Sequence, residues 1–195
     1  MKTPDIIEVA CKVVKVFEKI GVAYHIGGSL ASSAFGIPRA TLDADIVADI
    51  KPDQVSKMEE FLKEEFYIDT EMIQNAIQYQ SAFNLIHLET LFKVDIFVLK
   101  HRPFDLQAFA RRVQKIVSED TSQKLFFATP EDIILHKLKW YKEGGKVSDR
   151  QWNDVIGILK VQGAQLDMSY LKQWAKELSV STLFKQAIVE AGSLN

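Results

Sequence analysis

The stretch that decides the fold is Tyr24–Asp49, YHIGGSLASSAFGIPRATLDADIVAD. It begins as a short apolar run that is broken by Gly27 and Gly28, and a segment of small residues follows. Glycines that end an apolar run, with Ser29 directly after them, are typical of a strand that turns into a helix. The pattern predicts three elements: a buried strand over 22–26, a short helix over 29–35 and a second strand over 42–50.

The second predicted strand alternates acidic and apolar side chains. Asp43, Asp45 and Val47 share one face, and the other face carries Ala44, Ile46 and Ala48. Side chains at i and i+2 are about 6–7 Å apart along a strand, so two ionised carboxylates repel each other there unless water or a cation separates them. Asp95 interrupts another apolar run, FKVDIFV. The three carboxylates suit Mg²⁺, which proteins hold through carboxylates and substrate phosphates; exposed aspartates on the outer face of a sheet are the alternative.

The segment Gly27-Gly28-Ser29 has the composition of a phosphate-binding turn. Glycines let the backbone approach an anion, a helix N-terminus presents free N–H groups, and Ser29 adds a hydroxyl donor. A plain turn with a helix cap fits the same residues. Arg39, in the following loop, can pair with phosphate or with the carboxylates, or it can lie in solvent.

The chain up to residue 128 mixes strands and helices, and the remainder is helical. Helices are predicted over 4–20, 52–66 and 103–112, with 71–79 ambiguous, and strands over 81–88 and 91–99. Two edge strands, over 113–117 and 124–128, are expected around a polar turn. Later helices are expected to begin at Thr129 and Ser148. We therefore expect an α+β (α/β) fold, a mixed β-sheet flanked by helices in residues 1–128, with a helical part over 129–195 packed on it.

Composition narrows the class of protein. The 195 residues are 47% hydrophobic and 26% charged, as in ordinary globular proteins, and the net charge of −2 provides no general basic field for nucleic acid. Cys11 is the only cysteine, so the chain can form neither an internal disulfide nor a thiolate zinc site. No apolar run is long enough for a membrane span. We expect a cytoplasmic protein with no membrane partner.

The glycine turn, the strand with Asp43 and Asp45, and the later Asp95 resemble the nucleotidyltransferase fold of the DNA polymerase β superfamily. The fuller stretch GGSLASSAFGIPRATLDADIV resembles minimal bacterial and archaeal nucleotidyltransferase-like proteins related to AbiE-type toxins, in which an R-x-T-x-D-x-D run follows the glycine helix. The segment TPEDIILHKLKWY, which contains Lys137, is similar to that group as well. The resemblance covers about residues 20–160.

The resemblance implies an enzyme that transfers a nucleoside monophosphate from an NTP such as ATP to an acceptor hydroxyl and releases pyrophosphate. The nucleotide-binding residues would be Gly27, Gly28, Ser29, Arg39 and Lys137. The catalytic and metal-binding residues would be Asp43, Asp45 and Asp95, with Mg²⁺ or Mn²⁺ as cofactor and Asp95 helping to activate the acceptor. Lys137 can equally be a lysine on a solvent-exposed helix face.

The acceptor stays open: an aminoglycoside-like small molecule, a tRNA end and a protein side chain are all compatible with the resemblance. The mild acidity of the chain argues modestly against a nucleic-acid partner. The alternative function is a nucleotide-binding or interaction module without turnover. A toxin controlled by an antitoxin would be a biological role for the same enzyme, and a homodimer partner is also compatible.

Overall fold

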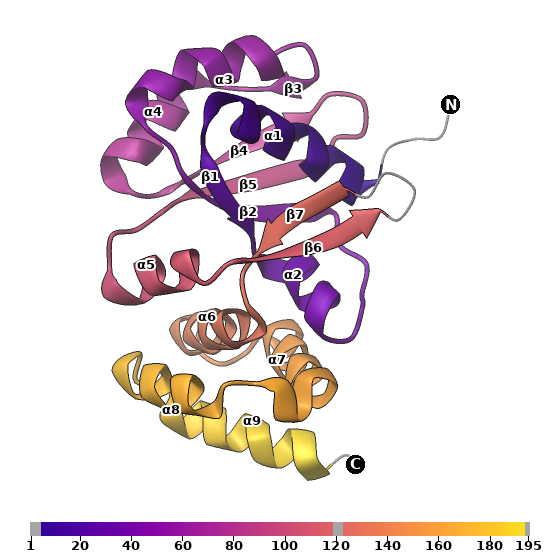
Figure 1. Ribbon diagram of the computed structural model, residues 1–195, viewed down its shortest axis with the longest axis vertical. Helices are drawn as coiled ribbons and strands as arrows, with labels where there is room; N and C mark the ends of the chain where they lie inside the picture. Colours follow the sequence, from indigo (N-terminus) through magenta and orange to yellow (C-terminus); the bar gives the residue numbers. More distant parts are fainter. Residues whose placement is uncertain (1–4, 119–122, 194–195) are drawn as a thin grey trace. The chain divides into compact units, whose positions relative to one another are not determined.

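The computed structural model describes residues 5–118 and 123–193 (Figure 1). The chain forms two compact units. The first comprises the chain up to Gly27 together with Thr41–Phe127, and the second comprises Gly28–Ala40 together with the chain from Ala128 onward. The short segment between the first two strands therefore belongs to the same unit as the C-terminal helices.

The first unit is built on a mixed sheet that has seven strands within the described residues, in the order β3-β4-β5-β2-β1-β7-β6. Strand β2 lies at its centre, antiparallel to β1 and parallel to β5. The strands are β1 (Ala23–Ile26), β2 (Asp43–Asp49), β3 (Phe66–Tyr67), β4 (Ala82–His87), β5 (Lys93–Val98), β6 (Val113–Ser118) and β7 (Gln123–Phe127).

Helices cover one face of this sheet. The helical elements of the first unit are α1 (Ile6–Ile20), η1 (Pro52–Gln54), α3 (Val55–Leu62), α4 (Thr70–Tyr79) and α5 (Pro103–Ala110). Helices α1, α3 and α4 form the covering layer (Figure 1). Ala44, Ile46 and Ala48 are fully buried, whereas the alternate residues of β2 are only partly buried. The predicted alternation in β2 is therefore confirmed, with its acidic residues on the partly exposed face.

Two predictions for the first unit are wrong, and long-range pairing is the reason for both. The helix predicted over 52–66 ends at Leu62, because Phe66 is buried in β3 and pairs with His87 of β4. The stretch 124–128 was expected at an edge, but β7 lies between β1 and β6, with Ile26 opposite Phe127. The ambiguous stretch 71–79 is helix α4. Residues 119–122 of the predicted polar turn, and residue 4 of the predicted first helix, lie outside the described residues.

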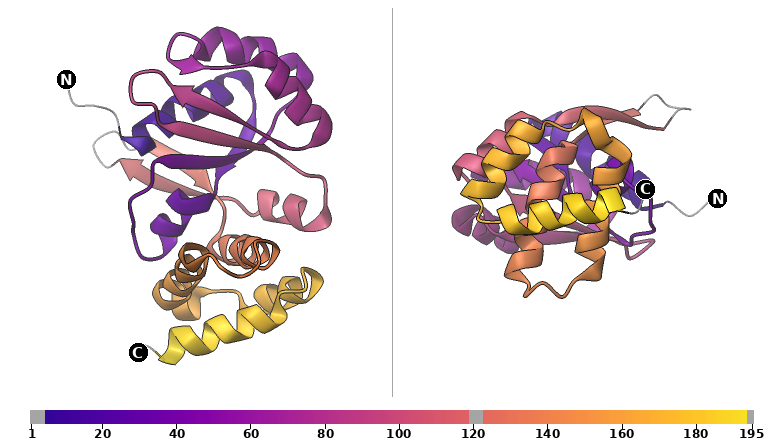
Figure 2. Two further views of the ribbon diagram at one scale, coloured as in Figure 1. Left: turned by 180° about the vertical axis from the view of Figure 1, so that it is seen from behind. Right: turned by 90° about the horizontal axis from the view of Figure 1, so that it is seen from below.

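The second unit is helical. Its elements are α2 (Gly28–Phe35), α6 (Pro130–Glu143), α7 (Asp149–Gln162), η2 (Gly163–Gln165), α8 (Met168–Glu177) and α9 (Ser181–Ser193). Helices α6 and α7 pack on each other, α8 and α9 pack against them, and α2 packs on both α6 and α7 (Figure 2). The predicted caps are confirmed, since the Thr129 side chain accepts from the Asp132 N–H and the Ser148 side chain accepts from the Gln151 N–H.

Glycines hold the end of α2 close to α7. A Cβ atom on Gly36 would lie 2.9 Å from the backbone nitrogen of Ile158, and one on Gly157 would lie 3.3 Å from the backbone nitrogen of Ile37. The Gln162 side-chain amide also donates to the Phe35 carbonyl at 2.6 Å. These contacts fix the segment that follows α2 against α7.

The Thr129–Asp132 segment is a structural anchor. Asp132 is fully buried and accepts hydrogen bonds from the Thr129 hydroxyl at 2.6 Å and from the Tyr170 hydroxyl at 2.6 Å. Glu131 accepts a hydrogen bond from the Asp167 N–H at 2.9 Å, which holds the start of α8 against the start of α6.

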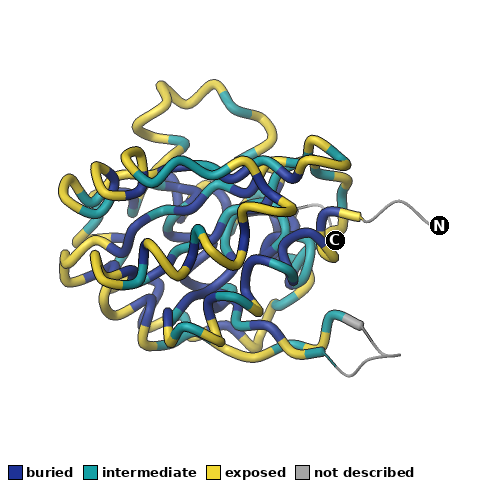
Figure 3. The backbone as a smooth tube through the Cα atoms, turned by 90° about the horizontal axis from the view of Figure 1, so that it is seen from above, coloured by how far each residue is buried: buried dark blue, intermediate teal, exposed yellow. Residues whose placement is uncertain are grey.

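Buried and exposed stretches alternate along the backbone, within helices and strands as well as between them (Figure 3). Among the described residues, no helix combines the length and the apolar character that crossing a bilayer requires.

Candidate functional site

The partly exposed face of β2 and β5 carries three aspartates and one lysine. Asp43 lies opposite Lys93, and Asp45 lies opposite Asp95, in the parallel register of the two strands. Directly paired residues on neighbouring strands point to the same side of a sheet. The four side chains, which we call the acidic face, therefore lie on the same face of the sheet, on two adjacent strands. The structure brings together the three predicted catalytic and metal-binding residues.

Two side-chain contacts hold residues of the acidic face. Asp43 accepts a hydrogen bond from the Thr41 hydroxyl, and the Lys93 ammonium lies 2.9 Å from a carboxylate oxygen of Asp95. The hydrogen bond to Asp95, together with the charges of all three aspartates, raises the pKa of Lys93 above its ordinary value. The Gly27 N–H donates to the Asp45 carbonyl at 2.8 Å. The end of β1 therefore lies directly beside Asp45.

The acidic face has the right chemistry for a hard divalent cation. Its oxygen donors are those that Mg²⁺ and Mn²⁺ prefer. In the described part of the chain, however, no three His, Cys, Asp or Glu side chains already converge as a metal site. The ammonium of Lys93 is bonded to Asp95 instead. The residues fit a divalent cation by type and by strand register, and the Lys93 ammonium already binds one oxygen of the Asp95 carboxylate.

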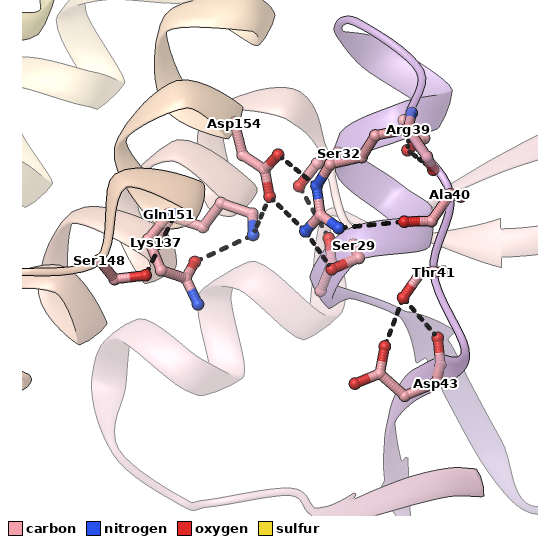
Figure 4. A network of polar contacts seen from close by, with 12 residues as sticks. Ser29, Ser32, Arg39, Ala40, Thr41, Asp43, Lys137, Ser148, Gln151 and Asp154 are labelled. Atoms are coloured by element: carbon pink, nitrogen blue, oxygen red, sulfur yellow. Dashed lines mark hydrogen bonds and ion pairs between the residues drawn. The ribbon is translucent and has the colours of Figure 1, made fainter.

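A second cluster lies within the helical unit. Arg39 donates from Nε and Nη2 to the two carboxylate oxygens of Asp154, at 2.9 and 3.0 Å. The Lys137 ammonium lies 2.8 Å from the same carboxylate and donates to the Gln151 side chain at 3.0 Å. Arg39 Nη2 also donates to the Ser29 hydroxyl at 2.5 Å. We call these five residues the buried cluster (Figure 4).

Three predicted nucleotide-binding residues meet in this cluster. Ser29 comes from the first turn of α2, Arg39 from the loop that follows, and Lys137 from α6. Lys137 is only 2% exposed, so the alternative of a solvent-facing lysine is wrong. Arg39 is likewise not a free loop residue, because its guanidinium donates to both Asp154 and Ser29.

The buried cluster carries a net positive charge, since two cations share one carboxylate. Burial alone would raise the pKa of Asp154, but the hydrogen bonds from Arg39 and Lys137 outweigh it and hold the pKa below its ordinary value. Asp154 is therefore an anion in the folded protein. One positive charge remains after this pairing, which favours an anionic ligand nearby.

Asp154 and Gln151 were missed by the sequence analysis. Asp154 lies 115 positions after Arg39, on helix α7 (Asp149–Gln162). The signal that could have found it is its helical spacing, because Asp154 is one turn before the buried Ile158 and so lies on the inner side of α7.

The two glycines mark the point where the chain passes between the units. Gly27 ends the segment of the first unit, and Gly28 begins the second unit with a positive φ of 51°. The Gly28 carbonyl accepts from the Ser32 hydroxyl at 2.8 Å. Asp43, Asp45, Asp95 and Gly27 thus belong to the first unit, and Gly28, Ser29, Arg39 and Lys137 to the second.

No protein-family model matches this chain, and no curated protein matches it by sequence. Solved structures do match. The antibiotic-resistance factor ANT(2'')-Ia is 12% identical over 95% of this chain and 95% of that chain, with a TM-score of 0.52. A structure of ANT(2'')-Ia in complex with adenylyl-2''-tobramycin is 11% identical over 88% and 95% of the two chains, with a TM-score of 0.55. An antigenic nucleotidyltransferase-like protein from Paracoccidioides brasiliensis is 18% identical over 88% and 90%, with a TM-score of 0.52.

These likenesses define the fold class. The chain has a nucleotidyltransferase-like fold, with a mixed sheet, flanking helices and further helices toward the C-terminus. The predicted fold is confirmed, whereas the closer likeness to AbiE-type proteins stays a prediction.

Proposed function

We propose that this protein is a metal-dependent nucleotidyltransferase. It would transfer a nucleoside monophosphate from an NTP to a hydroxyl group of an acceptor and release pyrophosphate. The observation that carries the proposal is the register of β2 and β5, which sets Asp45 opposite Asp95 with Asp43 on the same face, in a chain with a nucleotidyltransferase-like fold.

The acidic face would supply the reaction centre. Asp43, Asp45 and Asp95 would hold Mg²⁺ or Mn²⁺, which when bound offsets the negative charge of the triphosphate. Asp95 would accept the proton of the acceptor hydroxyl as its oxygen attacks the α-phosphorus. The bond from that phosphorus to the bridging oxygen breaks, and pyrophosphate leaves with the bonding electrons.

The glycine turn and the buried cluster would bind the phosphates. Gly27 and Gly28 leave room for an anion beside the backbone, and α2 begins at Gly28 with free N–H groups. The Ser29 hydroxyl accepts from Arg39, so its own proton is available for a phosphate oxygen. Lys137 would act mainly through charge, because it is buried and keeps the cluster positive.

The acceptor that best fits the structural likenesses is a small molecule with a hydroxyl group. ANT(2'')-Ia is described as an antibiotic-resistance factor, and one of its structures contains adenylyl-2''-tobramycin. The fold is therefore compatible with adenylyl transfer to an alcohol. We propose ATP as the first NTP to test, with a tRNA end or a protein side chain as further acceptors.

A second candidate is a nucleotide-binding module without turnover. The ion pair between Lys93 and Asp95 favours this alternative, because it engages the carboxylate that catalysis would use. The two candidates differ in product formation, since both bind an NTP and only the enzyme releases pyrophosphate.

The proposal is tested by thermal unfolding with each of the four common NTPs, with and without Mg²⁺. A ligand at a hundredfold excess over its dissociation constant stabilises the native state by about 2.7 kcal/mol. We expect a metal-dependent rise in Tm that Asp45→Asn abolishes and Asp49→Asn retains. Asp49 is a matched control because it lies on β2, two residues beyond Val47, and pairs with Lys51.

Product formation separates the enzyme from the binding module. An NTP labelled in its α-phosphate is incubated with candidate acceptors, and the release of pyrophosphate is measured alongside label transfer. Retention of the NTP-dependent stabilisation in Asp45→Asn would disprove the metal site. Stabilisation without pyrophosphate release across all acceptor classes would favour the module.

A further inference from the structure

Lys93 lies on the acidic face but has no role in the proposed function. It is two residues before Asp95 on β5, so both side chains point to the same side of the sheet. Its ammonium lies 2.9 Å from Asp95, with the Lys93 side chain 47% exposed and that of Asp95 20% exposed. The pair is therefore formed at the surface, where partners can exchange.

The neighbours of Lys93 explain why its ammonium turns toward the aspartates. Lys93 lies opposite Asp43 of β2 and opposite Ile86 of β4. The side chain of Ile86 has no hydrogen-bond acceptor. Asp95, in turn, lies between Asp45 and Asn84. Every carboxylate near Lys93 on these strands thus belongs to the acidic face.

A divalent cation and the Lys93 ammonium would compete on this surface. Both are attracted to Asp95, and like charges that share one carboxylate repel each other. The ammonium is tethered by a flexible four-carbon stem, so it can leave Asp95 without leaving the acidic face. A nucleotide triphosphate would give the displaced ammonium a new anionic partner.

We propose that Lys93 is a tethered counter-ion of Asp95 that a divalent cation displaces, after which the ammonium binds the triphosphate. The inference rests on the proposed function and extends it to the order of binding. Metal alone has to compete with Lys93, whereas metal with nucleotide does not. Lys93 therefore makes metal binding depend on the nucleotide, as a coupling between two ligands.

The test is a calorimetric titration of the full chain with Mn²⁺, with and without a non-hydrolysable ATP analogue. In the parent, we expect the analogue to tighten Mn²⁺ binding. In Lys93→Met, Mn²⁺ alone should bind more tightly, on the order of fivefold, because the effect is limited to that of one exposed ion pair. The analogue should then tighten Mn²⁺ binding less than in the parent, and Lys93→Arg should behave like the parent.

Lys51→Met is the matched control. Lys51 forms an ion pair of 2.7 Å with Asp49, also with a spacing of two residues, at the far end of β2 from Asp43. The Lys51→Met substitution should leave the affinity for Mn²⁺ unchanged. Equal Mn²⁺ affinity in the parent and Lys93→Met, with the same effect of the analogue, would overturn the inference.

The same titration separates failure of the inference from failure of the proposed function. If Mn²⁺ with the analogue binds the parent but not Asp45→Asn, while Lys93→Met equals the parent, the inference alone is wrong. If Mn²⁺ binds none of these proteins with or without the analogue, the metal-dependent function is wrong and the inference fails with it.

Discussion

Two lysine–aspartate ion pairs in this protein have nearly the same distance but differ in solvent exposure. Lys93 and Asp95 are 2.9 Å apart with side chains 47% and 20% exposed, whereas Lys137 and Asp154 are 2.8 Å apart with side chains 2% and 5% exposed. The buried pair also has Arg39 and Gln151 as partners. The distance between two charged groups therefore does not show whether the pair can exchange partners. The exposed pair can exchange its cation, whereas the buried pair is held by its further partners.

The largest expected effect comes from removing the buried carboxylate. Asp154→Ala would leave Lys137 and Arg39 beside each other without their shared anion, and breaking a buried pair costs about 3–5 kcal/mol. Urea unfolding measures the loss of stability. Asp49→Ala, which breaks the exposed pair with Lys51, should cost less than about 1 kcal/mol. Equal losses in the two variants would remove the distinction between buried and exposed pairs.

A smaller loss is expected at the glycine that holds the Arg39 segment on α7. In Gly36→Ala, the new methyl group would meet the Ile158 backbone nitrogen at 2.9 Å, and overpacking of this kind costs about 1–3 kcal/mol. The measurement is again urea unfolding. Gly192→Ala is the control, because its Cβ would meet nothing within 4 Å and alanine favours a helix. A neutral Gly36→Ala would mean that α2 and α7 can separate at little cost.

The pH dependence of stability tests whether Asp154 is ionised in the folded protein. The pKa of Asp154 is held below its ordinary value of 3.8, so the folded state binds this proton less readily than the unfolded state. The stability that Asp154 contributes is therefore full well above pH 3.8, and it is lost as the pH falls through the lower value of the folded protein. We expect the stability advantage of the parent over Asp154→Asn to be constant near neutrality and to shrink in acid. An advantage that grows on acidification would contradict the assignment.

The smallest expected effect on stability is that of Lys93→Met. An exposed ion pair contributes up to about 1 kcal/mol, and salt screens it. Urea unfolding in EDTA at low and high ionic strength should show a small loss that declines with salt. A loss as large as that of Asp154→Ala would show that Lys93 is a structural residue and cannot exchange partners.

The face of the strand on which each aspartate lies could be predicted because this signal is local, whereas the grouping of Asp95 with the other two followed from the family resemblance. Alternation over seven residues of β2 places Asp43 and Asp45 together, and the same period sets Asp95 on the outer face of β5. The glycine turn and the helix caps are local signals as well, and these local signals were enough to predict the class of fold.

The buried cluster could not be predicted in full because it depends on contacts between distant segments. Arg39 meets Asp154 across 115 positions, and no short pattern connects them. The same limit applies to β3, where Phe66 continues a helical pattern in the sequence yet pairs with β4 in the structure. The residues that could not be predicted are those whose partners are distant in the sequence and come together only through tertiary packing.

The grouping of α2 with the C-terminal helices has a consequence for biosynthesis. The ribosome makes α2 (Gly28–Phe35) long before α6 (Pro130–Glu143) and α7 (Asp149–Gln162), on which it packs. Domains generally fold as units while the chain emerges, but α2 cannot pack on both α6 and α7 until residue 162 has been translated. Ser29 and Arg39 can therefore meet Lys137 and Asp154 only after α6 and α7 have been made, and a chain that ended earlier would carry the acidic face without the buried cluster.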